Sequence, residues 1–166
     1  MAYNTVILKN YVNNFGEGVA NAAIKPGMLI EVMSTGNYRA HAGSAQTCLP
    51  IVALENKLEG KGLADAYAAA DKVQYWIPQR GDEAYLQLAD EQNIAIGDFL
   101  VSNGAGYVTK LVRTVDSWES ADSQAAKSLY TDKIIGQALE ALDLSSLSAA
   151  GSSDTPVRAF IRVRIM

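Results

Sequence analysis

Apolar residues recur along this chain in short runs of strand length, and glycine, asparagine and proline separate the runs. The clearest alternation lies at residues 72–77, where Val73, Tyr75 and Ile77 alternate with polar side chains. Successive side chains of a strand point to opposite faces, so this pattern predicts a strand that buries one face. Similar runs predict strands at residues 28–33, 38–41, 51–54 and 83–88, and an extended segment at residues 3–12.

The last apolar run sets Ile161, Val163 and Ile165 against two arginines, which predicts a half-buried strand at residues 160–165. Helix has only two weak candidates: residues 63–70, which are barely two turns long, and residues 123–129. Residues 145–155 are rich in serine, alanine and glycine and are typical of a long loop.

A short motif occurs twice, at residues 24–30 and again at residues 94–100, with a glycine just before the start of an apolar run. Each copy is followed by a glycine turn and a tyrosine. Glycine lets the backbone turn sharply before it enters a strand. The repetition therefore predicts two similar hairpins.

Together these elements predict an all-β fold with one or two short helices: a small β-barrel or sandwich at residues 16–166, preceded by an extended N-terminal arm at residues 1–15. The arm is too apolar for a free tail and too rich in β-branched and aromatic residues for a helix. We therefore expect it to lie extended against another chain. The predicted interface residues are Tyr3, Val6, Ile7, Leu8, Tyr11 and Val12.

Composition narrows the classes of function. The 166 residues are 49% hydrophobic and 19% charged, which is typical of a globular chain and not of a disordered one. The net charge of −4 disfavours binding to a phosphate backbone, so no nucleic-acid partner is expected. No apolar run approaches the roughly 20 residues of a membrane span, and the N-terminus lacks the pattern of a signal peptide. We expect synthesis in a cytoplasm and no membrane partner.

The chain has one histidine, His41, and one cysteine, Cys48, so a structural zinc site of the usual composition is not expected. No nucleophile elbow or zinc-binding helix motif accompanies His41, and Cys48 has the surroundings of a small packed residue. Adjacent acidic pairs such as Asp82 and Glu83 point to opposite faces of a strand and do not form a dyad. The sequence thus predicts no catalytic residues, no metal and no cofactor.

Three segments resemble tailed-phage capsid decoration (cement) proteins. These are residues 54–62 together with the acidic and aromatic residues after them, residues 94–104, and residues 135–142 followed by the arginine-containing last strand. Each motif is common by itself, and their order and spacing carry the resemblance, which covers the chain from about Pro26 to Met166. The N-terminal arm matches nothing in the family.

The resemblance implies a β-barrel of the β-tulip kind that binds the outside of an icosahedral shell and stabilises the lattice of the major capsid protein. It also implies a homotrimer, located on the capsid exterior, with no catalytic residues. The acidic balance agrees with an exterior position, because the inner surface of a shell faces DNA.

Two other functions stay open from the residues alone. One is a capsid- or fibre-borne β-barrel module that binds a receptor or a glycan, which needs aromatic side chains clustered on one face. The other is a small hydrolase in which His41 finds serine or carboxylate partners only in the fold.

Overall fold

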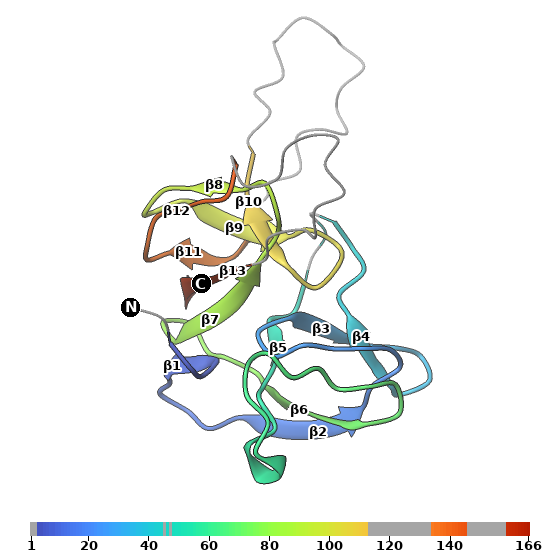
Figure 1. The fold of residues 1–166 in the computed structure, drawn as a ribbon. Coiled ribbons are helices and arrows are strands. Elements are labelled where there is room, and N and C mark those ends of the chain that lie inside the picture. The colour runs from blue at the N-terminus through green and yellow to red at the C-terminus, as the bar shows by residue number, and fades with distance from the viewer. Residues whose placement is uncertain (1–2, 45, 47, 113–133, 146–158) are drawn as a thin grey trace, which may run out of the picture.

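The computed structural model describes residues 3–44, 46, 48–112, 134–145 and 159–166. These residues form two β-sheets, a short pair of strands and a single turn of 3-10 helix (Figure 1). The all-β prediction is confirmed. The elements are β1 (Ile7–Lys9), β2 (Phe15–Val19), β3 (Leu29–Val32), β4 (Tyr38–Ala40), β5 (Ile51–Ala53), η1 (Lys57–Glu59), β6 (Lys72–Trp76), β7 (Glu83–Leu88), β8 (Asn93–Ile94), β9 (Phe99–Ser102), β10 (Val108–Lys110), β11 (Ile134–Ala138), β12 (Leu142–Asp143) and β13 (Ala159–Ile165).

The first sheet closes into a five-stranded barrel. Its strand order is β7-β10-β9-β11-β13, and β13 returns to pair with β7 along six residues. All of these pairings are antiparallel except β10–β7, which is parallel and meets only at Val108 and Leu88. β10 therefore covers only the end of β7, and β1 pairs with the beginning of the same strand.

The second sheet has the order β2-β6-β5-β3-β4 and is antiparallel throughout. An isolated bridge between Ala20 and Tyr38 joins its two ends, so the sheet curls almost into a second barrel. The strands predicted as one barrel thus divide into a closed barrel and a curled sheet. Each contains one copy of the repeated hairpin, β3–β4 in the sheet and β9–β10 in the barrel.

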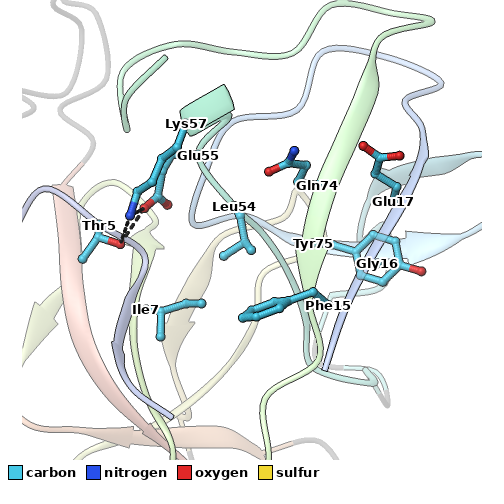
Figure 2. A pocket seen from close by; sticks show the side chains of 10 residues that line it. All are labelled: Thr5, Ile7, Phe15, Gly16, Glu17, Leu54, Glu55, Lys57, Gln74 and Tyr75. Carbon is cyan, nitrogen blue, oxygen red and sulfur yellow. Dashed lines mark hydrogen bonds and ion pairs between the residues drawn. The ribbon is translucent and has the colours of Figure 1, made fainter. Parts of the chain in front are cut away.

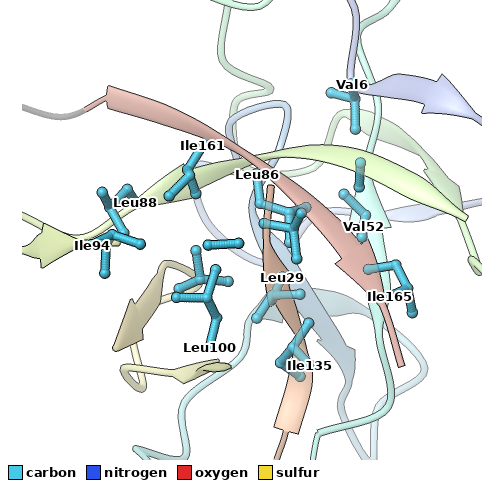
Figure 3. Packing of buried hydrophobic residues seen from close by; sticks show 14 of the residues in the cluster. Val6, Leu29, Val52, Leu86, Leu88, Ile94, Leu100, Ile135, Ile161 and Ile165 are labelled. Carbon is cyan, nitrogen blue, oxygen red and sulfur yellow. The ribbon is translucent and has the colours of Figure 1, made fainter. Parts of the chain in front are cut away.

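Buried side chains form two clusters, one inside each sheet. The barrel cluster, shown in Figure 3, also takes in Leu29, Val52 and Trp76 from the outer face of the second sheet. The neighbouring residues Ile30 and Val73 belong to the other cluster. The central strands of the second sheet are therefore covered on both faces where they meet the barrel.

This contact explains one difference from the predicted pattern. The alternation at residues 72–77 correctly places Val73 inward, but Trp76, on the opposite face, is completely buried against the barrel. In β13 only one face meets a core, and there the prediction is confirmed: Ile161, Val163 and Ile165 are all buried.

The predicted helix at residues 63–70 is wrong. Tyr67 is buried and forms an isolated antiparallel bridge with Ile24, in which each backbone N–H donates to the partner's carbonyl. These tertiary bonds outweigh the weak helix preference of so short a segment. Residues 123–129 and 146–155 lie outside the described residues. Within the described part of the chain, no helix has the length and apolarity needed to cross a membrane.

The N-terminal segment does not reach out as an arm, which corrects the expectation for residues 1–15. Val6 is fully buried in the barrel cluster, and its carbonyl accepts a hydrogen bond from the N–H of Tyr85 at 2.8 Å. Ile7 pairs with Ala84 of β7. The physical reason is the half of the β7 edge that β10 leaves open, because β1 satisfies those backbone groups within its own chain.

Candidate functional site

A groove of about 700 Å³ runs along the junction between the N-terminal segment and the second sheet (Figure 2). Its apolar middle consists of Ile7 from β1, Phe15 from β2 and Leu54, which follows β5. Phe15 is 52% exposed although its ring borders an apolar surface. The groove is therefore a hollow with an exposed aromatic side chain on its wall.

One end of the groove is polar and internally satisfied. The buried carboxylate of Glu55 accepts hydrogen bonds from Thr5 Oγ1 at 2.5 Å and from the backbone N–H of Val6 at 3.2 Å, and Lys57 Nζ lies 3.0 Å away. Burial alone would raise the pKa of Glu55, but these hydrogen bonds outweigh it and hold the pKa below its usual value. This cluster fixes the N-terminal segment onto the second sheet.

The opposite end of the groove is polar and open. Gln74 of β6 and Glu17 of β2 project there from directly paired positions, on the same face of the sheet. Glu17 is exposed, and no described side chain forms an ion pair or hydrogen bond with it. The groove thus leads from an apolar wall to an exposed carboxylate.

Two tyrosines hold β2 in place from its inner face. A Cβ on Gly16 would overlap the ring of Tyr75, and a Cβ on Gly18 would overlap the ring of Tyr38. Only glycine at these two positions lets the rings lie directly on the strand. The hydroxyl of Tyr38 donates to that of Tyr75 at 2.8 Å, which joins the two rings into one support.

The contact between Tyr38 and Tyr75 predicts that the protein loses stability at alkaline pH, when Tyr38 ionises. Burial, together with the hydrogen bond to Tyr75, raises the pKa of Tyr38 to about 12, whereas an unfolded tyrosine titrates near pH ~10. The stability contributed by the neutral hydroxyl is therefore complete below pH ~10 and is lost as the pH rises through the folded pKa. In a stopped-flow titration of tyrosinate absorbance, Tyr38→Phe should remove the most alkaline step. An unchanged last step would contradict this assignment.

The six predicted interface residues fall into two groups. Val6 is buried, and Tyr3, Ile7 and Leu8 are half-buried against their own chain, so they are not a free surface. Tyr11 and Val12 lie in the connection between β1 and β2 and are 65% and 55% exposed. The prediction of an interface stays open for these two residues.

Sequence reasoning missed that the exposed apolar surface extends into β2. Phe15 and Val19 are exposed, as are Tyr11 and Val12, so four of the ten exposed large apolar residues of the described chain lie in segment 11–19. The groove itself is assembled from residues about 70 positions apart in the chain. The apolar composition of the N-terminus was the only signal for it in the sequence.

His41 is buried at the contact between the second sheet and the barrel. Its Nδ1 lies 2.7 Å from Ser102 Oγ of β9, and its Nε2 lies 3.6 Å from a carboxylate oxygen of Glu31 in β3. Glu31 also accepts from Arg39 Nε at 2.7 Å. The hydroxyl and carboxylate that the hydrolase hypothesis required are thus both close to His41.

The geometry of this cluster does not suit hydrolysis, however. Ser102 is completely buried, and its Oγ accepts a hydrogen bond from the N–H of Gly104 at 3.2 Å. His41 itself is only 4% exposed. A catalytic nucleophile must contact its substrate, and the buried hydroxyl of Ser102 is not accessible to one. The cluster instead connects the barrel to the second sheet.

His41→Ala should therefore destabilise the protein. The substitution leaves a cavity and removes the partner of a buried hydroxyl, which costs about 1–3 kcal/mol. Arg39→Ala is the control, because loss of an exposed ion pair costs about 0–1 kcal/mol. Urea denaturation measures both, and equal losses would contradict the role given to His41.

Cys48 matches the expectation of a small packed residue. Burial, aided by the negative charge of Glu31, raises the pKa of its thiol to about 12, so the thiol stays neutral at ordinary pH. Among the described residues, no three histidine, cysteine or acidic side chains are grouped so that they could hold a metal ion.

No protein-family model matches the chain, and no curated protein sequence matches it significantly.

Proposed function

We propose that this protein is a structural virion component that binds the outer surface of a tailed-phage capsid and stabilises the lattice of the major capsid protein. The observation that carries the proposal is the exposed apolar segment 11–19. Four large apolar side chains are exposed in this short segment, and one of them, Phe15, lines the groove, although the chain has two cores in which to bury such residues. Exposed apolar residues gathered at one place are typical of a protein-binding surface.

Three further features support this proposal. The family resemblance in the sequence names the major capsid protein as partner and a homotrimer as the bound form. The net charge of −4 suits the outside of a DNA-filled shell. The closed barrel removes most strand edges, which suits a protein whose role is mechanical.

The binding surface can be tested with a pair of matched substitutions. Val12→Asp combined with Phe15→Asp should leave the fold intact and reduce occupancy on purified particles at least about tenfold, which corresponds to a loss of about 1.4 kcal/mol. Ile96→Asp is the control, since Ile96 is 71% exposed but lies in a turn of the barrel. Co-sedimentation with particles that lack the protein measures the occupancy. Equal binding by both variants would contradict the proposed surface.

A further inference from the structure

A second hollow adjoins the groove on the outer face of the second sheet. It has a volume of about 370 Å³, and residues of η1, of segment 67–72 and of β2 and β6 line it. Most of these side chains are charged or carry an amide, so we call it the polar hollow. Glu17 and Gln74, which project beside each other in Figure 2, line both the groove and the polar hollow. The two hollows therefore adjoin at this pair, and together they are called the trough.

The register of β2 and β6 sets the order of side chains along the trough. Directly paired residues point to the same face, and the pairs on the outer face are Phe15 with Trp76, Glu17 with Gln74, and Val19 with Lys72. Trp76 is covered by the barrel, so the uncovered part of this face begins at Phe15. A bound group would therefore meet an apolar wall first. About 7 Å further along the strand it would meet a carboxylate beside an amide.

The lining of the trough has an excess of negative charge, with four acidic and three basic residues. Two of the carboxylates have a lysine of their own: Glu55 lies 3.0 Å from Lys57, and Glu59 lies 2.7 Å from Lys61. Glu17 has no ion pair among the described residues, and it lies where the groove and the polar hollow adjoin. A cationic group at this point is therefore favoured over an anionic one.

The walls of the trough are held in place by contacts within the chain. The rings of Tyr75 and Tyr38 lie directly on Gly16 and Gly18 and support β2 from its inner face. At the closed end of the groove, the hydrogen bonds of Glu55 fix the N-terminal segment. A site that is formed before binding loses less conformational entropy when a partner binds. The trough is thus suited to one defined arrangement of partner side chains.

We propose that the trough receives a surface segment of the major capsid protein in which a large apolar residue and an arginine lie two positions apart. The apolar side chain would pack on Phe15 and Leu54, and the arginine would reach Glu17 and Gln74. Arginine suits this place better than lysine, because its planar guanidinium can donate to a carboxylate and to an amide oxygen at the same time. In an extended segment, side chains two positions apart point to the same side at a spacing of about 7 Å, which matches Phe15 and Glu17. In its choice of partner, this inference rests on the proposed function.

Lys72 limits how far into the polar hollow the arginine would lie. It is the next residue of β6 on the same face as Gln74, and its side chain is exposed. A guanidinium displaced toward Lys72 would meet a like charge, whereas a guanidinium at Glu17 meets an opposite charge. The order of apolar wall, carboxylate and ammonium group therefore places the arginine at Glu17.

The first test measures the occupancy of full-length variants on purified particles that lack the protein, by co-sedimentation below saturation. Glu17→Lys should reduce occupancy about fivefold, because the arginine would then meet a like charge. Glu91→Lys makes the same charge change in a turn of the barrel and should leave occupancy unchanged. Both glutamates are exposed, so both variants should fold. Equal occupancy of the two variants would overturn the proposal.

The second test needs no particles and uses the full chain with the blocked peptide acetyl-Leu-Thr-Arg-amide. Its counterparts are acetyl-Leu-Thr-Glu-amide, which changes the charge, and acetyl-Ser-Thr-Arg-amide, which removes the apolar group. Nuclear magnetic resonance of the side-chain amide of Gln74 follows binding at millimolar peptide. The first peptide should bind about fivefold more tightly than either counterpart, and Glu17→Lys should make the glutamate peptide the tighter ligand. No preference in the wild-type chain, or no reversal in the variant, would overturn the proposal.

The outcomes also separate this inference from the proposed function. If particles bind the wild-type chain and Glu17→Lys equally well, the trough proposal is wrong and capsid binding stands. If the peptides show the preference and its reversal but particles do not bind the wild-type chain, the chemistry assigned to the trough is supported and the proposed function fails. If the free chain self-associates in sedimentation velocity and acetyl-Leu-Thr-Arg-amide dissociates it, the trough holds a second copy and the proposal is overturned.

Discussion

Val163→Asp is expected to unfold the protein. Val163 is completely buried in the barrel cluster, where β13 pairs with both β7 and β11. A carboxylate at this position would have no partner, and the effective cost of burying an unpaired charge is several kcal/mol. A domain of ordinary size is stable by only about 5–15 kcal/mol. Circular dichroism and gel filtration should show loss of the native state.

Arg162→Ser is the neighbouring control on the opposite face of β13. The sequence predicted that this face of β13 is simply exposed to solvent. In the structure, Arg162 Nη2 lies 2.6 Å from an oxygen of the buried carboxylate of Glu83. The hydrogen bond from Arg162, opposed by burial and aided by Arg164, holds the pKa of Glu83 below its usual value. Because Arg164 still approaches Glu83, the variant should fold with a loss of about 1–2 kcal/mol. Equally mild effects of both substitutions would contradict the assigned orientation of β13.

Removal of residues 2–9 is expected to destabilise the whole protein, and not only its binding to a shell. The deletion exposes the site that Val6 fills, which alone is worth about 1.5–3 kcal/mol. It also removes Thr5 and the N–H of Val6 from the buried carboxylate of Glu55 and opens the first half of the β7 edge. Urea denaturation should show a total loss above about 3 kcal/mol.

The double substitution Tyr11→Ser with Val12→Ser is the control for this deletion. Both side chains are mostly exposed, so the free energy of unfolding should change by less than about 0.5 kcal/mol for each. If the deletion variant were as stable as the wild-type chain, β1 would not be part of the barrel, and residues 1–15 would after all be an arm available to lie against another chain.

Local patterns predicted most of the strands correctly. The alternation around Val163 identified the buried face of β13, because that strand has a core on one side only. The repeated motif predicted both hairpins, and Gly27 and Gly97 each adopt a positive φ before the first strand of their hairpin. These features depend on neighbouring residues and on the two-residue period of a strand.

The features that the sequence did not predict depend on contacts between distant segments. Nothing near Trp76 indicates that a barrel will cover the outer face of its sheet. His41 and Ser102 meet across 61 positions of the chain, and the groove joins Phe15 to Leu54 and Gln74. The N-terminal segment was assigned to another chain because its apolar residues had no visible partner in the sequence. The open part of β7 is that partner.

Electron cryomicroscopy of purified virions, with occupancy counted on each symmetry axis, tests whether this protein decorates the capsid. We expect density for this protein on the outer capsid surface, as trimers at three-fold and quasi-three-fold positions, with segment 11–19 facing the major capsid protein. Virions that lack the protein, or that hold it inside the shell, would contradict the proposed function.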